Sequence, residues 1–148
     1  MLTIEPKIHL WTREEYYRMA ETGLFIGKRV ERIGGEILEM SPQRNDHTVG
    51  IGLVAHVLAE IWGPGVWIRQ QAPLDLDPDS DPEPDLAVVT GEPRDYRSHP
   101  KSALLVVEVS DSTLSFDRGR KASLYARAGV ADYWILNLVD RQLEVRRK

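Results

Sequence analysis

Cysteine is absent from the 148-residue chain, so neither a disulfide framework nor a thiolate metal site can form. Long apolar runs are also absent, since none approaches the roughly 20 residues needed to span a bilayer. The first residues lack the basic and apolar regions of a signal peptide. Together these absences predict a cytoplasmic protein that does not bind membranes.

An excess of positive charge is missing as well. The formal net charge is −4, which argues against a generic nucleic-acid coat protein. An enzyme that meets phosphate through a bound metal ion is not excluded, because the ion itself supplies local positive charge. The length and the 42% hydrophobic fraction predict one domain, residues 1–148, with one core.

Local patterns predict an alternation of helices and strands. The expected elements are a helix after a capping box at Thr12 and Glu15, a hairpin over 29–40, helices over 47–62 and 117–128, and strands over 66–76, 85–89, 103–109, 132–139 and 143–146. Four apolar residues of the second helix share one stripe: Val49, Leu53, Val57 and Ile61. The order predicts a mixed α/β or α+β fold in which helices pack on a sheet.

Two acids interrupt the apolar strands. Glu108 lies near the end of the run 103–109, whose pattern is typical of a strand covered on both faces. Burying an unpaired ionised carboxyl is costly, so Glu108 must be neutral, paired or metal-bound. Asp85 opens the apolar run 86–89, and two acids on neighbouring strands suit Mg²⁺, which prefers carboxylate oxygens. A turn role for Asp85 and a buried salt bridge for Glu108 remain the alternatives.

A lysine near these acids would complete a hydrolytic site. Ser110 shares a strand face with Glu108 and takes the place of a lysine there, so the nearest candidate for the lysine is Lys121 on the following helix. The helix could return the ammonium of Lys121 to the acids. Alternatively, Lys121 forms an exposed pair with Asp117, worth only ~0.3–0.5 kcal/mol.

Two other features have plainer interpretations. The acidic run 75–83 lacks the glycine and glutamate that a calcium-binding loop requires, so we expect a mobile, solvated loop. His47 could assist the acids, but a histidine satisfied at a helix start is the simpler interpretation.

Several blocks of the chain, taken in order, resemble the Uma-two family, which is grouped with restriction endonucleases in the PD-(D/E)xK nuclease superfamily. The blocks are residues 84–89, 106–113 and 128–135, the helix positions Asp117, Lys121 and Tyr125, and the hairpin 30–37 followed by residues 40–42. The similarity covers nearly the whole chain from about Thr12. Relatives usually continue for a few strands or turns beyond the position of Lys148.

This resemblance implies a restriction-endonuclease-like core in the order αβββαβ, with acids at the centre of a mixed sheet. Asp85 and Glu108 would hold Mg²⁺ or Mn²⁺, Glu31 would be a third acid ligand, and Lys121 would be a catalytic lysine that has moved from strand to helix. The implied activity is metal-dependent endonucleolytic cleavage of DNA, and a second copy of the chain is a further candidate partner. The alternative is a non-catalytic interaction or regulatory module that retains the nuclease fold.

Overall fold

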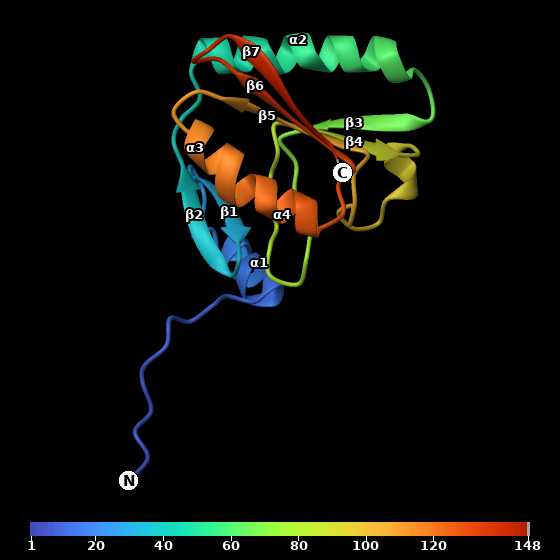
Figure 1. Ribbon diagram of the computed structural model, residues 1–148. Coiled ribbons are helices and arrows are strands. Elements are labelled where there is room, and N and C mark those ends of the chain that lie inside the picture. The colour runs from blue at the N-terminus through green and yellow to red at the C-terminus, as the bar shows by residue number, and fades with distance from the viewer. Residues whose placement is uncertain (148) are drawn as a thin grey trace.

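The computed structural model describes residues 1–147. In chain order the elements are α1 (Arg13–Glu21), β1 (Arg29–Ile33), β2 (Glu36–Met40), α2 (Asn45–Trp62), β3 (Val66–Gln70), β4 (Leu86–Thr90), a 3₁₀ turn η1 (Pro93–Asp95), β5 (Leu105–Ser110), α3 (Leu114–Phe116), a π-helical turn η2 (Asp117–Lys121), α4 (Ala122–Arg127), β6 (Asp132–Asn137) and β7 (Gln142–Arg147). Figure 1 shows residues before α1 as an extended arm leaving the body. No helix in this described range is long and apolar enough to cross a membrane.

The N-terminal helix and hairpin form where local chemistry predicts them. The hydroxyl of Thr12 accepts from the amide of Glu15, and the Glu15 carboxylate accepts from the amide of Thr12, which completes the capping box. Strands β1 and β2 pair antiparallel around Gly34 and Gly35, which have φ values of 59° and 76°. Positive φ at both turn residues matches the right-handed twist of the flanking strands, and glycine adopts it without strain.

Five strands form one mixed sheet in the order β3-β4-β5-β6-β7. Strands β5 and β6 are parallel and are joined by α3, η2 and α4, whereas the other neighbours are antiparallel. The succession α2, β3, β4, β5, α4, β6 reproduces the expected αβββαβ order. The predicted fold class, a mixed sheet with helices on it, is therefore confirmed.

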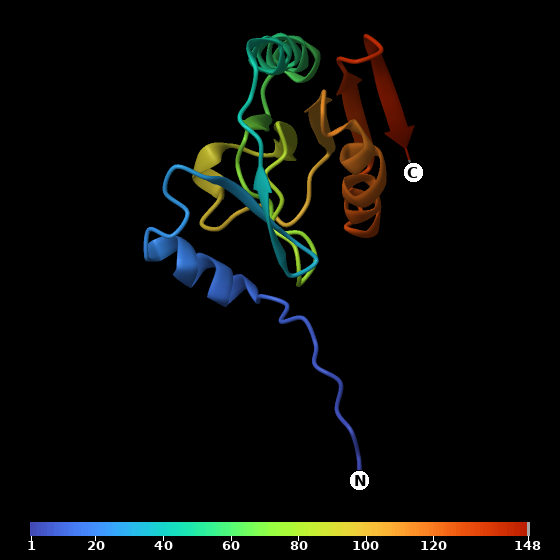
Figure 2. The same ribbon diagram turned by 90° about the vertical axis from the view of Figure 1, so that its left-hand side faces the viewer.

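Helices cover both faces of this sheet (Figures 1 and 2). On one face, α2 contributes Ile51 and Leu58 to a core cluster with the β5 residues Leu105, Val107 and Val109. On the other face, α4 contributes Leu124 and Tyr125 to a second core cluster that includes Val106 of β5. Every residue of β5 is buried as a result. The apolar run and its embedded acid at position 108 therefore lie at the centre of the molecule, as predicted.

The apolar stripe of α2 does not face this core. Val49, Leu53, Val57 and Ile61 are 48–64% exposed, whereas the sheet side of the helix carries Gly50. A Cβ atom at Gly50 would stand 3.1 Å from Val109 and 3.3 Å from Leu136. Because glycine has no side chain, the helix comes close to the sheet at Gly50. The buried side of the helix is formed by Gly50, Ile51 and Leu58 instead of the apolar stripe.

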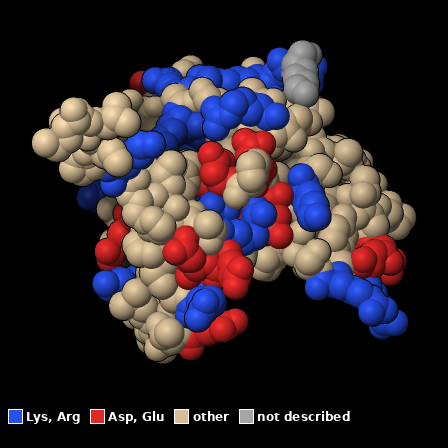
Figure 3. Space-filling model, turned by 90° about the horizontal axis from the view of Figure 1, so that it is seen from below, with Lys and Arg blue, Asp and Glu red and all other residues tan. Residues whose placement is uncertain are grey.

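The acidic segment between β3 and β4 is not a solvated loop, and that prediction is wrong. Leu74, Leu76 and Asp81 are fully buried, and Arg13 and Arg32 each donate to the Asp81 carboxylate over 2.6 Å. In Figure 3 acidic and basic side chains interleave on the lower face, where this segment lies in Figure 1. Two arginines, from α1 and β1, replace the water that would otherwise hydrate Asp81. Strand β3 is also shorter than predicted and ends at Gln70.

Candidate active site

A cavity of about 380 Å³ lies between the hairpin and the end of β5, and the four predicted site residues all line it. Its wall comes from β1, the segment leading into α2, the residues before β4, the end of β5 and η2. In Figure 2 the hairpin and the α3–α4 segment stand on either side of this region. The structure therefore brings together Glu31, Asp85, Glu108 and Lys121 from four distant parts of the chain.

Lys121 is the centre of a buried network. Its Nζ donates to Oε1 of Glu31 and to Oε1 of Glu108, each over 3.0 Å. It also lies 3.1 Å from the hydroxyl of Tyr125, which donates to the same Oε1 of Glu108 over 2.7 Å. Lys121 is 1% exposed, Glu31 3% and Glu108 6%. The buried salt bridge considered for Glu108 thus exists, and its cation is the predicted site lysine rather than an arginine.

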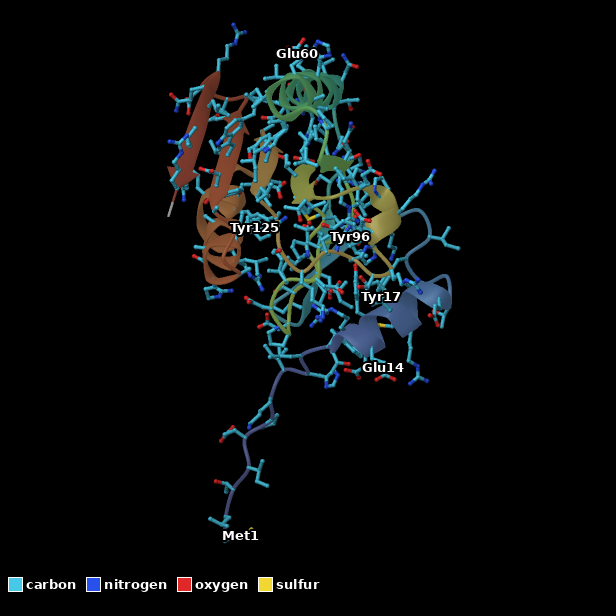
Figure 4. The ribbon with its side chains drawn as sticks, turned by 90° about the vertical axis from the view of Figure 1, so that its right-hand side faces the viewer. Met1, Glu14, Tyr17, Glu60, Tyr96 and Tyr125 are labelled. Carbon is cyan, nitrogen blue, oxygen red and sulfur yellow. The ribbon has the colours of Figure 1, made fainter. Side chains whose placement is uncertain are left out.

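The π-helical turn aims Lys121 at the acids. The predicted helix begins at Leu114 rather than at Asp117, and η2 interrupts it before α4. A π turn inserts one residue into the helical repeat and is frequent at functional sites. Lys121 ends this turn, and Tyr125 follows four residues later on α4. Figure 4 shows Tyr125 between α4 and the sheet, where its hydroxyl reaches Glu108.

Asp117 forms hydrogen bonds with Ser110 and Thr113 and not the predicted ion pair with Lys121. Ser110 and Thr113 both donate their hydroxyl protons to Oδ2 of Asp117, and Lys121 turns instead toward Glu31 and Glu108. The exposed Lys121–Asp117 pair is therefore absent among the described residues. Burial raises the pKa of Asp117, while the two hydroxyl hydrogen bonds oppose that shift. Ser110 lies on the same face of β5 as Glu108. Its hydroxyl holds Asp117 at the position that the side chain of a strand lysine would occupy.

Asp85 holds the end of β5 and meets a histidine. Its Oδ2 accepts from the amide of Val109 over 2.7 Å, and Nε2 of His47 lies 3.1 Å from its Oδ1. Asp85 is 4% exposed, so it is more than a turn residue. His47 lies in the first turn of α2, but its ring contacts an acid of the site. The contact agrees with the alternative interpretation, in which His47 assists the acids, although 38 residues separate it from Asp85.

The hairpin and the segment before β4 place a further acid, Glu83, beside Glu31. The amide of Glu83 donates to Oε1 of Glu31, while Oε2 of Glu31 is buried without a hydrogen-bond partner among the described residues. Burial and the charge of Glu31 raise the pKa of Glu83, which also lines the cavity. The sequence interpretation missed Glu83, since it assigned that residue to a solvated loop.

Burial and the neighbouring charges shift the pKa values of the residues in this network. Burial opposes the charged form of Lys121, yet Glu108 and Glu31 together raise the pKa of Lys121 above its ordinary value. Burial raises the pKa of Glu108 well above its usual range, although the ammonium of Lys121 opposes this. Burial and the nearby Glu108 charge also raise the pKa of Tyr125, so its phenol stays protonated and donates. Lys121 is consequently a fixed cation at neutral pH.

Among residues 1–147, no group of three or more His, Asp or Glu side chains is arranged to hold a metal ion. The ammonium of Lys121 occupies the space between Glu31 and Glu108 in this arrangement. Mg²⁺ needs only one or two protein carboxylates, because it keeps several water ligands. Asp85 and Glu108 fit that requirement, since both line the cavity and Oε2 of Glu108 has no hydrogen-bond partner in the described chain. Their role as ligands, and that of Glu31, stays a prediction.

Comparisons with known proteins agree with this architecture. The model of the Uma2 family, described as "Putative restriction endonuclease", matches residues 13–148. A crystal structure of a protein from Anabaena variabilis, described as a putative nuclease belonging to DUF820, superposes with a TM-score of 0.73 at 16% sequence identity and covers 92% of this chain and 79% of that chain. No curated protein was found to match. The structural similarity shows a shared fold, and the family match over nearly the whole sequence shows that the chain belongs to the Uma2 family.

Proposed function

We propose that this protein is a Mg²⁺-dependent nuclease that hydrolyses phosphodiester bonds in DNA within the cavity beside η2. The observation that carries the proposal is the convergence of Lys121 with Glu31 and Glu108 over 3.0 Å, at the wall of a cavity that Asp85 also lines. Family membership and the shared nuclease fold support the same reaction class. Fold alone would not suffice, because function lives in the residues of the site.

Asp85 and Glu108 would hold the ion, with water completing its coordination. When bound there, Mg²⁺ would polarise the scissile phosphate and lower the pKa of the attacking water. Glu108 is suited to binding through a single oxygen, because Lys121 and Tyr125 both engage Oε1 and leave Oε2 free of protein partners in the described chain. The amide of Val109 likewise fixes Oδ2 of Asp85 and directs the other oxygen toward His47.

Lys121 would stabilise the negative charge that develops on the phosphate in the transition state. Glu31 and Glu108 raise the pKa of Lys121, so its ammonium keeps its proton and cannot serve as the general base. A cation held by two carboxylates needs little reorganisation during the reaction, which is the condition for effective electrostatic stabilisation. Glu31 then acts in this scheme by positioning Lys121 through Oε1.

One observation favours the second candidate function, a non-catalytic module that retains the nuclease fold. Lys121 already satisfies Glu31 and Glu108, so the network is paired internally without any ligand. The net charge of −4 agrees with this alternative, because nucleic-acid binding is usually driven by basic surfaces. A partner protein rather than a nucleic acid would then bind at or near the cavity.

Cleavage assays on duplex DNA, single-stranded DNA and RNA, with Mg²⁺, Mn²⁺ or a chelator, separate the two functions. We expect metal-dependent cleavage by the wild type and a loss of at least ~100-fold in Asp85→Ala, which removes a proposed ligand. Glu21→Ala removes an exposed acid at the end of α1 and should cleave like the wild type. A folded wild-type protein that cleaves no substrate with either ion would support the non-catalytic module.

A further inference from the structure

The cavity is lined by more acidic than basic side chains. The acids are Glu31, Glu83, Asp85, Glu108, Asp111 and Asp117. Lys121 adds little attraction for an anion outside the cavity, since Glu31 and Glu108 already neutralise its ammonium. A metal ion at Asp85 and Glu108 would serve the reacting phosphate. A nucleic-acid strand carries a negative charge at every phosphate, so the neighbouring phosphates need cations from other residues in order to bind.

Two arginines line the cavity without a carboxylate partner. Within residues 1–147, no Asp or Glu oxygen lies within 4.0 Å of the guanidinium of Arg29 or of Arg44. The neighbour of Arg29 is neutral, because its Nη1 lies 3.2 Å from the side-chain amide of Gln43. Other arginines of the chain do bind acids, as in Arg13, Arg32, Arg118 and Arg120. The positive charge of Arg29 and Arg44 is therefore available to an anion that enters the cavity.

Both arginines lie between Glu31 and the start of α2. Arg29 and Glu31 are two positions apart on β1, so their side chains share a face and their Cα atoms are about 6.6 Å apart. Arg29 pairs with Met40 of β2, and the chain continues from there to Arg44, directly before α2. Figure 2 shows this segment running from β2 to the start of α2. The two guanidiniums therefore follow one another from the proposed reaction centre toward α2.

We propose that Arg29 and Arg44 bind the phosphates next to the one that is cleaved, and that these contacts position the DNA strand without reading its bases. The proposal rests on the nuclease function proposed above. Arginine suits this role, because its planar guanidinium can donate two parallel hydrogen bonds to one phosphate. Within the described chain no Phe, Tyr or Trp lines the cavity, so the stacking platform on which proteins hold unpaired bases is missing there. Contacts to phosphates fix register and orientation and carry no sequence information.

The salt dependence of DNA binding tests the proposal, because each phosphate contact releases counterions. Fluorescence anisotropy measures binding of a short labelled DNA in Ca²⁺, which takes oxygen ligands as Mg²⁺ does, and a gel checks that the DNA stays intact. We expect Arg29→Gln and Arg44→Gln each to weaken binding by ~10-fold. Each should also reduce the steepness of log K against log salt concentration by ~0.9 for a duplex or ~0.7 for a single strand.

Two further variants separate a phosphate contact from a general effect of charge. Arg94→Gln removes the same charge from an exposed position outside the cavity, and it should keep the wild-type slope. Arg29→Lys keeps the charge but loses the planar pair of donors, so it should keep the slope while binding DNA less tightly. Circular dichroism checks that each variant is folded. An unchanged slope in both folded cavity variants, Arg29→Gln and Arg44→Gln, overturns the proposal, and so does an equal reduction in Arg94→Gln.

Two DNA sequences distinguish phosphate contacts from base recognition. Arg29→Gln and Arg44→Gln should weaken binding of an A·T duplex and of a G·C duplex by the same factor, as loss of a phosphate contact does. A loss confined to the G·C duplex would show that the arginines bind guanine, and the proposal fails.

Binding and cleavage, measured together, separate this inference from the proposed function. If the wild type cleaves DNA while Arg29→Gln and Arg44→Gln keep its salt slope, the phosphate contacts are wrong and the nuclease function stands. If both variants show the expected slopes while the wild type cleaves DNA with neither Mg²⁺ nor Mn²⁺, the contacts stand and the nuclease function fails. A wild type that binds neither duplex nor single-stranded DNA at low salt overturns the contacts.

Discussion

At the scale of single residues, Lys121 combines a structural and a proposed catalytic role. It is the cation between two buried carboxylates, Glu31 and Glu108, and those two acids would repel each other without it. Removing one partner of a buried ion pair usually costs more than the pair contributes, because an uncompensated charge is left behind. Stability and activity must therefore be measured together in any Lys121 variant.

We expect Lys121→Ala to lower the free energy of unfolding by ~3–5 kcal/mol, measured by urea denaturation at neutral pH. In conditions where the variant is folded, cleavage should fall by ~10²–10³-fold, the effect of losing one preorganised electrostatic group. Metal binding should survive, since an ammonium is not a ligand. Adding Ser110→Lys returns an ammonium to the Glu108 face of β5 and should rescue activity in part.

The matched control is Lys101→Ala, which removes an exposed lysine outside the cavity and should change neither quantity. Wild-type cleavage rates in folded Lys121→Ala would remove Lys121 from the mechanism. An unchanged free energy of unfolding would show that the network contributes nothing to stability.

The raised pKa of Asp117 leads us to expect that the stability of the fold depends on pH. Burial raises the pKa of Asp117 in the folded protein, so the folded state holds this proton to a higher pH than the unfolded state does. The stabilisation is fully present below the unfolded pKa of about 3.9 and is lost as the pH rises through the raised folded pKa. In Asp117→Asn this titration is absent, while an amide oxygen can still accept from Ser110 and Thr113.

Urea denaturation of wild type and Asp117→Asn at pH 4 and pH 7 measures this effect. The wild type should lose more stability than the variant between the two pH values, because all other titrating groups are common to both. Glu21→Gln, at an exposed position, should parallel the wild type. A wild type that gains stability relative to Asp117→Asn over this range would show that the folded pKa of Asp117 is lowered instead.

At the scale of elements, the hairpin is tied to the segment before β4 by ions rather than by apolar packing alone. Arg32 of β1 donates to Asp81 and to the carbonyls of Trp11 and Pro78, and Arg13 of α1 donates to the same Asp81. These contacts fix the segment whose Glu83 amide binds Glu31. The position of Glu31 in the cavity thus depends on residues that do not line it.

Asp81→Ala should lower the free energy of unfolding by ~3–5 kcal/mol in urea denaturation, because it leaves the Arg32 guanidinium buried without its carboxylate. Asp79→Asn removes a charge in the same segment at an exposed position and keeps an oxygen that accepts from the hydroxyl of Ser80, so it should change stability by no more than ~0.5 kcal/mol. Equal effects of the two substitutions would contradict the role given to the ion network.

At the scale of the whole molecule, a metal bound between Asp85 and Glu108 would connect β4, β5 and, through His47, α2. Any ligand that binds only the folded state stabilises it by mass action. Mg²⁺ or Mn²⁺ at ~100 times its dissociation constant should therefore add ~2.7 kcal/mol to the free energy of unfolding. Thermal denaturation with and without each ion measures this directly.

Asp85→Ala should abolish most of that stabilisation, and Glu21→Ala should retain it. If neither ion raises the melting temperature of the wild type up to millimolar concentrations, the proposed metal site is wrong. Stabilisation of equal size in wild type and Asp85→Ala would place the ion elsewhere on the protein.

The sequence by itself determined the features that depend on near neighbours. The capping box and the two-glycine hairpin formed as predicted, because their hydrogen bonds and φ values involve residues a few positions apart. The β5 strand was indicated by the apolar composition of its own residues, although its hydrogen-bond partners lie on β4 and β6. The conflict between the apolar run and Glu108 also drew attention to a residue that lines the cavity. The family resemblance supplied the mixed-sheet order and the remaining candidate residues, which the cavity brings together.

Only the tertiary structure decided which distant groups meet. Lys121 pairs with Glu31 across 90 positions, His47 reaches Asp85, and Asp81 is buried between arginines of two other elements. The outward side of α2 was likewise set by the close approach of Gly50 to the sheet, which a count of apolar residues does not register. Local patterns record propensity and periodicity, whereas burial and ion pairing depend on the packing of elements that the sequence separates.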